Sequence, residues 1–124
     1  MKFLISILSL SIFAHAGQVF KGYAHFKVKP EFVDQFRYEV GKIIAPTRKE
    51  KGCISYEAYQ VVNEKGAPIN EFVFHEIWKT KNDMMIDHKE KAPHMIHFFS
   101  KVKVGEKDSW VESFNVSGLE VNQL

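Results

Sequence analysis

The stretch EFVFHEIW, Glu71–Trp78, alternates in a way that predicts a β-strand with two apolar faces. One face carries aromatic residues and a carboxylate: Phe72, Phe74, Glu76 and Trp78. The other face carries Val73, His75 and Ile77. Aromatic and β-branched residues favour the pleated, half-buried surface of a sheet. Because both faces are apolar, we expect both of them to be covered.

Two further strands are predicted before this one. Cys53–Val62, CISYEAYQVV, is rich in aromatic and β-branched residues. Residues 63–70, NEKGAPIN, contain the Asn, Gly and Pro of a turn, so the two strands beside them should form an antiparallel hairpin. Earlier in the chain, QVFKGYAHFKVKP, residues 18–30, alternates with period two until Pro30 stops it.

A helix is predicted between the first and second strands. Pro30 suits its first turn. Its apolar face comprises Phe32, Phe36, Val40, Ile43, Ile44 and Thr47. We expect it to run to about Ala45, because Pro46 has no N–H to donate and its ring crowds the preceding turn.

Helical spacing returns after the third strand. Thr80 and Asp83 form a capping signal for a segment that carries Met84, Met85 and His88. Pro93 restarts the helix. The apolar stripe of this second part is Met95, Phe98, Phe99 and Val102. DSWVESFNV, residues 108–116, is predicted as the last strand, and the tail from Ser117 has no assignment.

The order of these elements is β-α-β-β-α-β, the ferredoxin-like α+β arrangement. It predicts a four-stranded antiparallel sheet with both helices on one face. The helices cannot cover Val73 and Ile77 on the other face. We therefore expect a homodimer in which the sheets of two subunits pack together.

The first residues of the chain resemble a secretory signal peptide. Lys2 provides a short positive region, Phe3–Phe13 is apolar, and Ala14-His15-Ala16 is a cleavage signal. An apolar run of this length spans only about 16 Å as a helix, roughly half of a bilayer core. We expect cleavage after Ala16, a signal peptide over residues 1–16, a mature domain over residues 17–124, and a periplasmic or secreted protein without a membrane span.

Composition narrows the possible functions further. The formal net charge is +2, and basic and acidic residues are interleaved, so no electrostatic footprint for nucleic acid is present. Cys53 is the single cysteine, which leaves no internal disulfide to stabilise the domain. A buried small hydrophobe is one interpretation of Cys53, and a reactive thiol or an intermolecular disulfide is the alternative.

Three segments resemble the antibiotic biosynthesis monooxygenase family: EKGCISYEAY, FHEIWKT and DHKEKAPHMIHF. The matching positions are Gly52, Cys53, Tyr56, Glu76, Trp78, His88, Pro93 and His94. The resemblance implies a dimeric α+β barrel. It also implies kinship with oxygenases of quinols and polycyclic phenols that use no cofactor, and with proteins that bind or degrade haem. The haem-degrading relatives carry a Trp where this chain has Asp87 or His88, which argues against a role with haem, although His94 or His97 could still serve as an axial ligand.

The candidate catalytic residues are His88 and Glu76, and the candidate substrate-binding residues are Trp78, Phe74, His94 and Met84. Glu76 would hold the ring of His88. His88, with a pKa near ~6.5 or higher, would take a proton from a phenolic hydroxyl. A buried structural pair without chemistry is the alternative. His94 and His97 share a helix face, but no carboxylate stands at a metal-binding offset from them, so we expect neither a metal site nor a cofactor.

These features predict an exported monooxygenase that oxidises an aromatic quinol or phenol with dioxygen. The alternative is a non-catalytic periplasmic protein that binds an apolar aromatic or haem-like ligand in the same pocket. Turnover of a quinol distinguishes the two hypotheses. The identity of the substrate does not follow from the sequence.

Overall fold

A computed structural model describes residues 19–120 of the chain, so the predicted signal peptide lies outside the described residues. The strands are β1 (Phe20–Val28), β2 (Cys53–Val62), β3 (Pro68–Trp78) and β4 (Val111–Glu120). The helical segments are η1 (Pro30–Phe32), α2 (Val33–Arg48), η2 (Asp83–Lys91) and α3 (Pro93–Val102). The predicted β-α-β-β-α-β order is confirmed.

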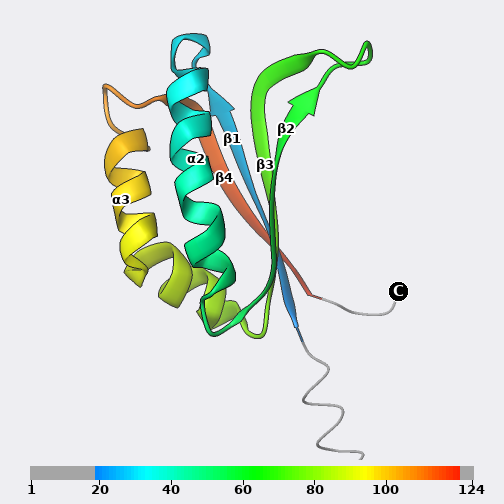
Figure 1. The fold of residues 1–124 in the computed structure, drawn as a ribbon, viewed down its shortest axis with the longest axis vertical. Coiled ribbons are helices and arrows are strands. Elements are labelled where there is room, and N and C mark those ends of the chain that lie inside the picture. Colours follow the sequence, from blue (N-terminus) through cyan, green and yellow to red (C-terminus); the bar gives the residue numbers. More distant parts are fainter. Residues whose placement is uncertain (1–18, 121–124) are drawn as a thin grey trace, which may run out of the picture.

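The strands form one antiparallel sheet in the order β2-β3-β1-β4. α2, η2 and α3 all lie on the same face of this sheet (Figure 1). The core fills the space between them, and its centre is Phe26, whose ring contacts those of Phe36, Phe74, Phe98 and Phe114. The period-two pattern of β1 and β3 thus aims alternate aromatic residues at the helices.

The other side of the sheet, which we call the open face, carries Val73, His75 and Ile77 of β3 and Tyr23 of β1. Tyr23 and His75 pair across the strands with their rings stacked at 4.8 Å. Within residues 19–120 no element covers these side chains (Figure 1). The expectation of two apolar sheet faces, of which the helices cover one, is therefore confirmed, whereas the dimer stays a prediction.

Two element boundaries and the type of one helix differ from the prediction. α2 continues through Pro46 to Arg48 although Pro46 forgoes one helical hydrogen bond, because Thr47 behind it is fully buried and the Pro46 carbonyl still accepts from the N–H of Lys49. β4 extends to Glu120 instead of ending near residue 116, because the tail pairs with β1. The first part of the second helix, η2, is a π-helix.

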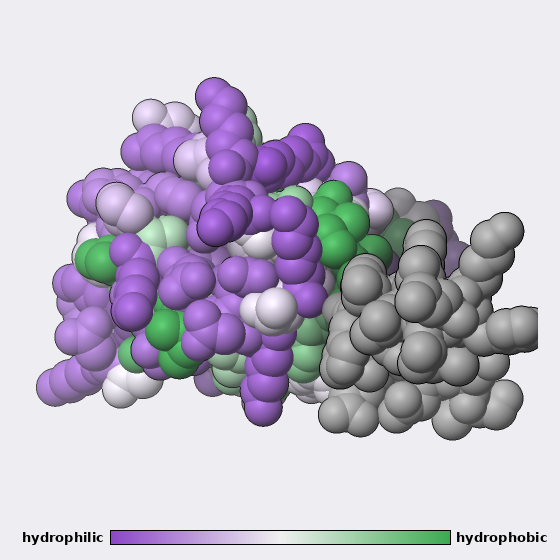
Figure 2. Space-filling model, turned by 90° about the horizontal axis from the view of Figure 1, so that it is seen from below, coloured by the Kyte–Doolittle hydropathy of each residue, from purple (hydrophilic) through white to green (hydrophobic). Residues whose placement is uncertain are grey.

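The surface away from the core is polar in character. Figure 2 shows the lower end of the molecule as mainly hydrophilic, with hydrophobic side chains in small groups. Single exposed hydrophobic residues of this kind are normal for a globular domain. No helix among the described residues is long and apolar enough to cross a membrane.

Candidate active site

The π-helix η2 places His88 over the end of β3, against Glu76 and Trp78. It begins after Thr80, whose hydroxyl accepts a hydrogen bond from the backbone N–H of Asp83 and donates one to its carboxylate. Met84 packs against β1 at Gly22, where any Cβ would collide with the Met84 sulfur. A glycine at this position therefore lets η2 approach the sheet closely. π-Helical turns are rare and often mark functional sites.

The imidazole of His88 is buried and has a carboxylate on each side. Its Nδ1 lies 2.6 Å from Oε2 of Glu50, and its Nε2 lies 3.8 Å from Oε1 of Glu76. Glu76 is itself fixed by Trp78, whose indole N–H donates to Oε1 at 2.9 Å. The ring of His88 also packs on the rings of Trp78, at 4.8 Å, and Tyr56, at 5.3 Å.

Glu50 reaches this site from the connection between α2 and β2. Its backbone N–H donates to the carbonyl of Thr47, and its own carbonyl accepts from Cys53. Gly52 next to it is buried against the Asp83 side chain, so a larger residue would push the connection away from η2. These contacts aim the carboxylate of Glu50 inward, between the helices and the sheet.

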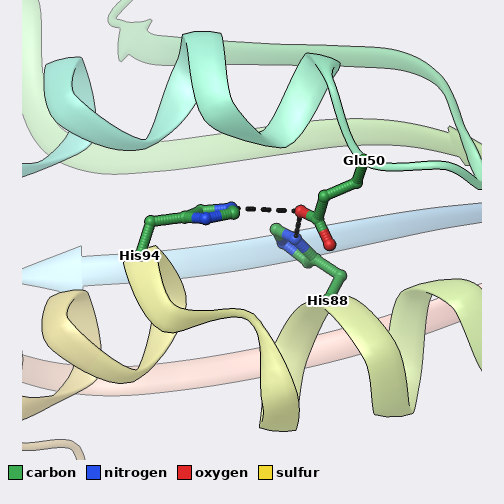
Figure 3. A group of neighbouring side chains, drawn as sticks. All are labelled: Glu50, His88 and His94. Carbon is green, nitrogen blue, oxygen red and sulfur yellow. Dashed lines mark hydrogen bonds and ion pairs between the residues drawn. The ribbon is translucent and has the colours of Figure 1, made fainter.

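His94, in the first turn of α3, completes the group shown in Figure 3. Its Nε2 lies 3.1 Å from Oε2 of Glu50 and 3.1 Å from the hydroxyl of Thr47. Figure 3 shows both imidazoles pointing at the same carboxylate from different helical segments. Glu50 therefore links two histidines that the sequence separates from it by 38 and 44 residues.

Burial sets the protonation of this group. Burial, followed by the charge of nearby Asp87, raises the pKa of Glu50 to about 7. Burial likewise raises the pKa of Glu76 to about 7, although the hydrogen bond from Trp78 opposes the rise. Burial, and secondarily His94, lowers the pKa of His88 to about 3. The expectation that His88 titrates near or above 6.5 is therefore wrong, because loss of hydration outweighs the attraction of the carboxylates.

A neutral His88 carries one proton on its ring. Where Glu50 is ionised, at pH above about 7, its 2.6 Å contact favours the tautomer that carries this proton on Nδ1 and donates it to the carboxylate. Nε2 is then unprotonated and turns its lone pair toward Glu76. The buried imidazole thus has the tautomer of a general base that a carboxylate orients.

A small cavity of about 20 Å³ lies beside His88, between the sheet and the helical segments. Its lining includes His88, Glu76, Tyr56, Phe74 and Met84. The hydroxyl of Tyr56 is buried and has no hydrogen-bond partner among the residues that the structure describes. A space of this size holds about one water molecule, so an aromatic ligand needs η2 or α3 to shift outward.

The sequence as a whole also places the chain among known proteins. The sequence profile of a family described as antibiotic biosynthesis monooxygenase matches residues 21–101, which include every element from β1 to α3. The chain belongs to the antibiotic biosynthesis monooxygenase family.

Two relatives show how far this kinship extends. YcnE of Bacillus subtilis, named as a candidate monooxygenase, is 35% identical over 80 residues, which are 64% of this chain and 78% of that protein. The uncharacterized protein sll1783 of Synechocystis is 34% identical over 77 residues, which are 62% of this chain. The match spans only 48% of sll1783, about half of its length.

The fold is also found in a solved structure. Rv0793 from Mycobacterium tuberculosis superposes with a TM-score of 0.65 at 24% identity, over 82% of this chain and 92% of that one. At this identity the likeness shows the shared fold alone. The resemblance and the ferredoxin-like α+β fold expected from the sequence are both confirmed.

Within this family member, the structure brings together most of the predicted site residues. His88, Glu76, Phe74 and Met84 line the cavity. Trp78 is fully buried and acts on the site through Glu76, so it is not placed to stack on a ligand there. His94 contacts Glu50 and is not among the residues that line this cavity.

Sequence reasoning missed two residues of the site. Glu50 stands in the charged run TRKEK, which is typical of a solvated surface, so nothing near it in the chain marks it. Tyr56 had a signal, because it belongs to the segment that resembles the family, and its period-two spacing from Ala58 places it on the helix-covered face of β2.

Proposed function

We propose that this protein is a monooxygenase that oxidises an electron-rich phenol or quinol with dioxygen and needs no bound cofactor. Membership of the family and the similarity to YcnE support the reaction class. The observation that carries the proposal is the buried His88, whose Nδ1 lies 2.6 Å from Oε2 of Glu50 and whose side chain lines the cavity. A base in that position can remove the hydroxyl proton that starts the reaction.

The base is the pair formed by Glu50 and His88. A charged imidazole is costly in this buried place. Nε2 therefore takes the phenolic proton while Nδ1 passes its own proton to Glu50 across the 2.6 Å contact. The negative charge moves from the carboxylate to the substrate, which becomes an electron-rich phenolate.

The phenolate then reacts with dioxygen. It gives one electron to O₂, and the resulting aryloxyl radical and superoxide combine to form a C–O bond. The pair of Glu50 and His88 returns its proton to the peroxide. Loss of water then breaks the O–O bond and takes the hydrogen from the ring carbon that bears the peroxide. The ring gains one oxygen as a carbonyl and loses two hydrogens. The second oxygen of O₂ leaves as water, so the reaction needs no external reductant.

The other residues of the cavity hold the substrate ring. Phe74 and Met84 offer apolar contacts to a flat molecule. The Tyr56 hydroxyl, buried without a partner among residues 19–120, can donate to a substrate oxygen. Such an unpaired buried group favours a ligand that satisfies it over one that does not.

Oxygen uptake with hydroquinone tests the proposal. The wild type should consume one O₂ per hydroxyquinone formed, and His88→Ala should lower turnover roughly 10²-fold or more, because removal of a general base has that effect. His97→Ala, which removes an exposed imidazole of α3, is the matched control and should retain the wild-type rate. Melting temperatures of both variants confirm that they are folded.

A wild-type rate no higher than autoxidation in buffer would refute the catalytic proposal, and so would full activity in His88→Ala. The cavity would then be a binding site for an aromatic ligand, which is the alternative considered from the sequence.

We further propose that the working form is an exported homodimer. The signal-like residues 1–16 support export, and the uncovered Val73 and Ile77 support self-association. Native mass spectrometry of protein recovered from its own host tests both points at once. A dimer of chains that begin at Gly17 is expected, and chains that retain Met1 would refute the cleavage.

A further inference from the structure

Three donor atoms from three separate segments converge beside the cavity (Figure 3). They are Oε2 of Glu50, Nδ1 of His88 and Nε2 of His94, and all of them lie within 4.8 Å of one another. Oε2 of Glu50 lies between the other two, at 2.6 Å from one nitrogen and 3.1 Å from the other. The mechanism proposed above uses only two of these residues and leaves His94 without a role.

We propose that Glu50, His88 and His94 form a binding site for a divalent transition-metal ion such as Zn²⁺, and that its occupancy switches His88 off as a base. Two imidazoles and one carboxylate are a common protein donor set for zinc. Mg²⁺ and Ca²⁺ prefer sets made of oxygen atoms, so the two nitrogens favour a transition metal.

The site requires only small movements to accept the ion. Zinc bonds of about 2.0–2.1 Å in a tetrahedral arrangement place the donor atoms roughly 3.3 Å apart. The two nitrogens, which lie within 4.8 Å of each other, have to approach by up to about 1.5 Å. The two contacts to Oε2, at 2.6 and 3.1 Å, have to lengthen by less than about 1 Å. Glu50 can withdraw by this amount, because its side chain is 17% exposed and starts from a connection between elements.

The surroundings of the donors are those of a metal site. Ligating histidines usually present their second nitrogen to a carboxylate, which fixes the orientation of the ring. Glu76 lies 3.8 Å from the second nitrogen of His88, and Trp78 holds Glu76 in place. Thr47 places a hydroxyl 3.1 Å from Nε2 of His94, and this hydrogen bond gives way when that nitrogen binds the ion. The partial exposure of Glu50 and His94 gives the ion a path from solvent.

The effect on turnover rests on the function proposed above, whereas the binding site rests on geometry alone. A metal bound to Nδ1 displaces the proton that donates to Glu50. The proton moves to the other nitrogen, so the neutral ring now carries its single proton on Nε2, which lies 3.8 Å from Glu76. Nε2 can no longer accept a proton from a substrate in the cavity, so the metal-bound form lacks the base.

Titration of protein freed of metal with a chelator tests the site. Calorimetry should give one Zn²⁺ per chain, and Co²⁺ should give the visible absorption bands of a tetrahedral site. His94→Ala and Glu50→Gln each remove one ligand and should weaken binding at least tenfold. Loss of a residue that only hydrogen-bonds to a ligand already lowers metal affinity about tenfold or more. His97→Ala is the matched control, because its imidazole is exposed on the same helix, and it should bind as the wild type does.

Absence of stoichiometric binding to the wild type would overturn the proposal, and so would equal affinity in His94→Ala and Glu50→Gln with both variants folded by circular dichroism. The conservative variant His94→Gln serves where His94→Ala does not fold. Oxygen uptake provides the second arm: Zn²⁺ at one equivalent should abolish hydroquinone turnover in the wild type. Binding without inhibition of an active enzyme would refute the switch. Binding to a protein that has no turnover even without metal would refute the proposed function and leave the metal site intact.

Discussion

The thiol of Cys53 lies half-buried at the start of β2, close to two carboxylates. Burial raises its pKa to about 11, and the negative charges of Glu50 and Glu76 add to the rise, while Arg48 opposes it. A raised pKa keeps the group a neutral thiol at physiological pH. Of the two interpretations of Cys53 made from the sequence, the unreactive thiol is therefore the one that its surroundings favour.

Cys53 should accordingly react slowly with Ellman's reagent. The thiolate is the attacking species, and at pH 8 its fraction is about 10²-fold lower than for an ordinary cysteine, which the greater nucleophilicity of a high-pKa thiol offsets in part. We expect the folded chain to react roughly tenfold more slowly than the same chain in denaturant, with a rate that still rises above pH 9. A folded-state rate equal to the denatured one would show that the thiolate is accessible and stable.

Single residues of the site differ in how far the sequence could reveal them. Glu76 follows from the alternation of β3, and His88 follows from its spacing after Met84, because both rules act over a few residues. Glu50 does not follow, since its contact with His88 spans 38 residues and depends on how the connection after α2 is held. The lowered pKa of His88 could not be predicted either. It is caused by burial, and the whole fold produces that burial.

At the level of elements, helical periodicity predicted where helices occur but not their type. Met84 and His88 face the sheet in the π-helix η2 as they would in an α-helix, so the apolar pattern cannot distinguish the two. The wider turn of this π-helix is stabilised by tertiary contacts at two glycines, Gly22 and Gly52. Because neither glycine has a Cβ, side chains of η2 can lie against the backbone there. When a glycine makes room for an element that is distant in the chain, the residues next to it in the sequence do not reveal this role.

A third glycine, Gly41, has no such role and should be replaceable. It lies exposed within α2, and a Cβ built there meets nothing within 4 Å. Glycine in a helix interior is less favourable than alanine by about 1 kcal/mol, so Gly41→Ala should stabilise the fold and raise the melting temperature by several degrees.

Gly22→Ala is the matched contrast, measured by the same thermal unfolding. The new Cβ collides with the sulfur of Met84, so this variant should melt at a lower temperature than the wild type. Stabilisation by Gly22→Ala, or destabilisation by Gly41→Ala, would contradict the packing described for these two elements.

The fold of the whole molecule was predictable because its determinants are regular. Period-two strands, period-3.6 helices and short connections permit few topologies, and β-α-β-β-α-β selects one of them. The end of β4 was not predictable, since Ser117 and Gly118 carry no strand signal and are extended because β1 offers them partners. Association of subunits belongs to this level too, because it depends on the surface that the finished fold leaves uncovered.

The open face should be a subunit interface. Val73, His75 and Ile77 lie on β3, which is an inner strand of the sheet, so they would occupy the centre of a face-to-face contact. The flat stack of Tyr23 on His75 offers an aromatic surface beside them. An interface of standard size removes about 800 Å² of surface from each partner, enough for a stable dimer.

Ile77→Asp tests this expectation by light scattering at micromolar concentration. Two-fold symmetry would bury two new carboxylates without partners, each at a cost of a few kcal/mol, so the variant should dissociate at concentrations at which the wild type is dimeric. Lys65→Asp makes a larger change of charge in the exposed hairpin loop and should leave the dimer intact. A monomeric wild type would refute the interface, and an Ile77→Asp dimer as tight as that of Lys65→Asp would place the contact elsewhere on the molecule.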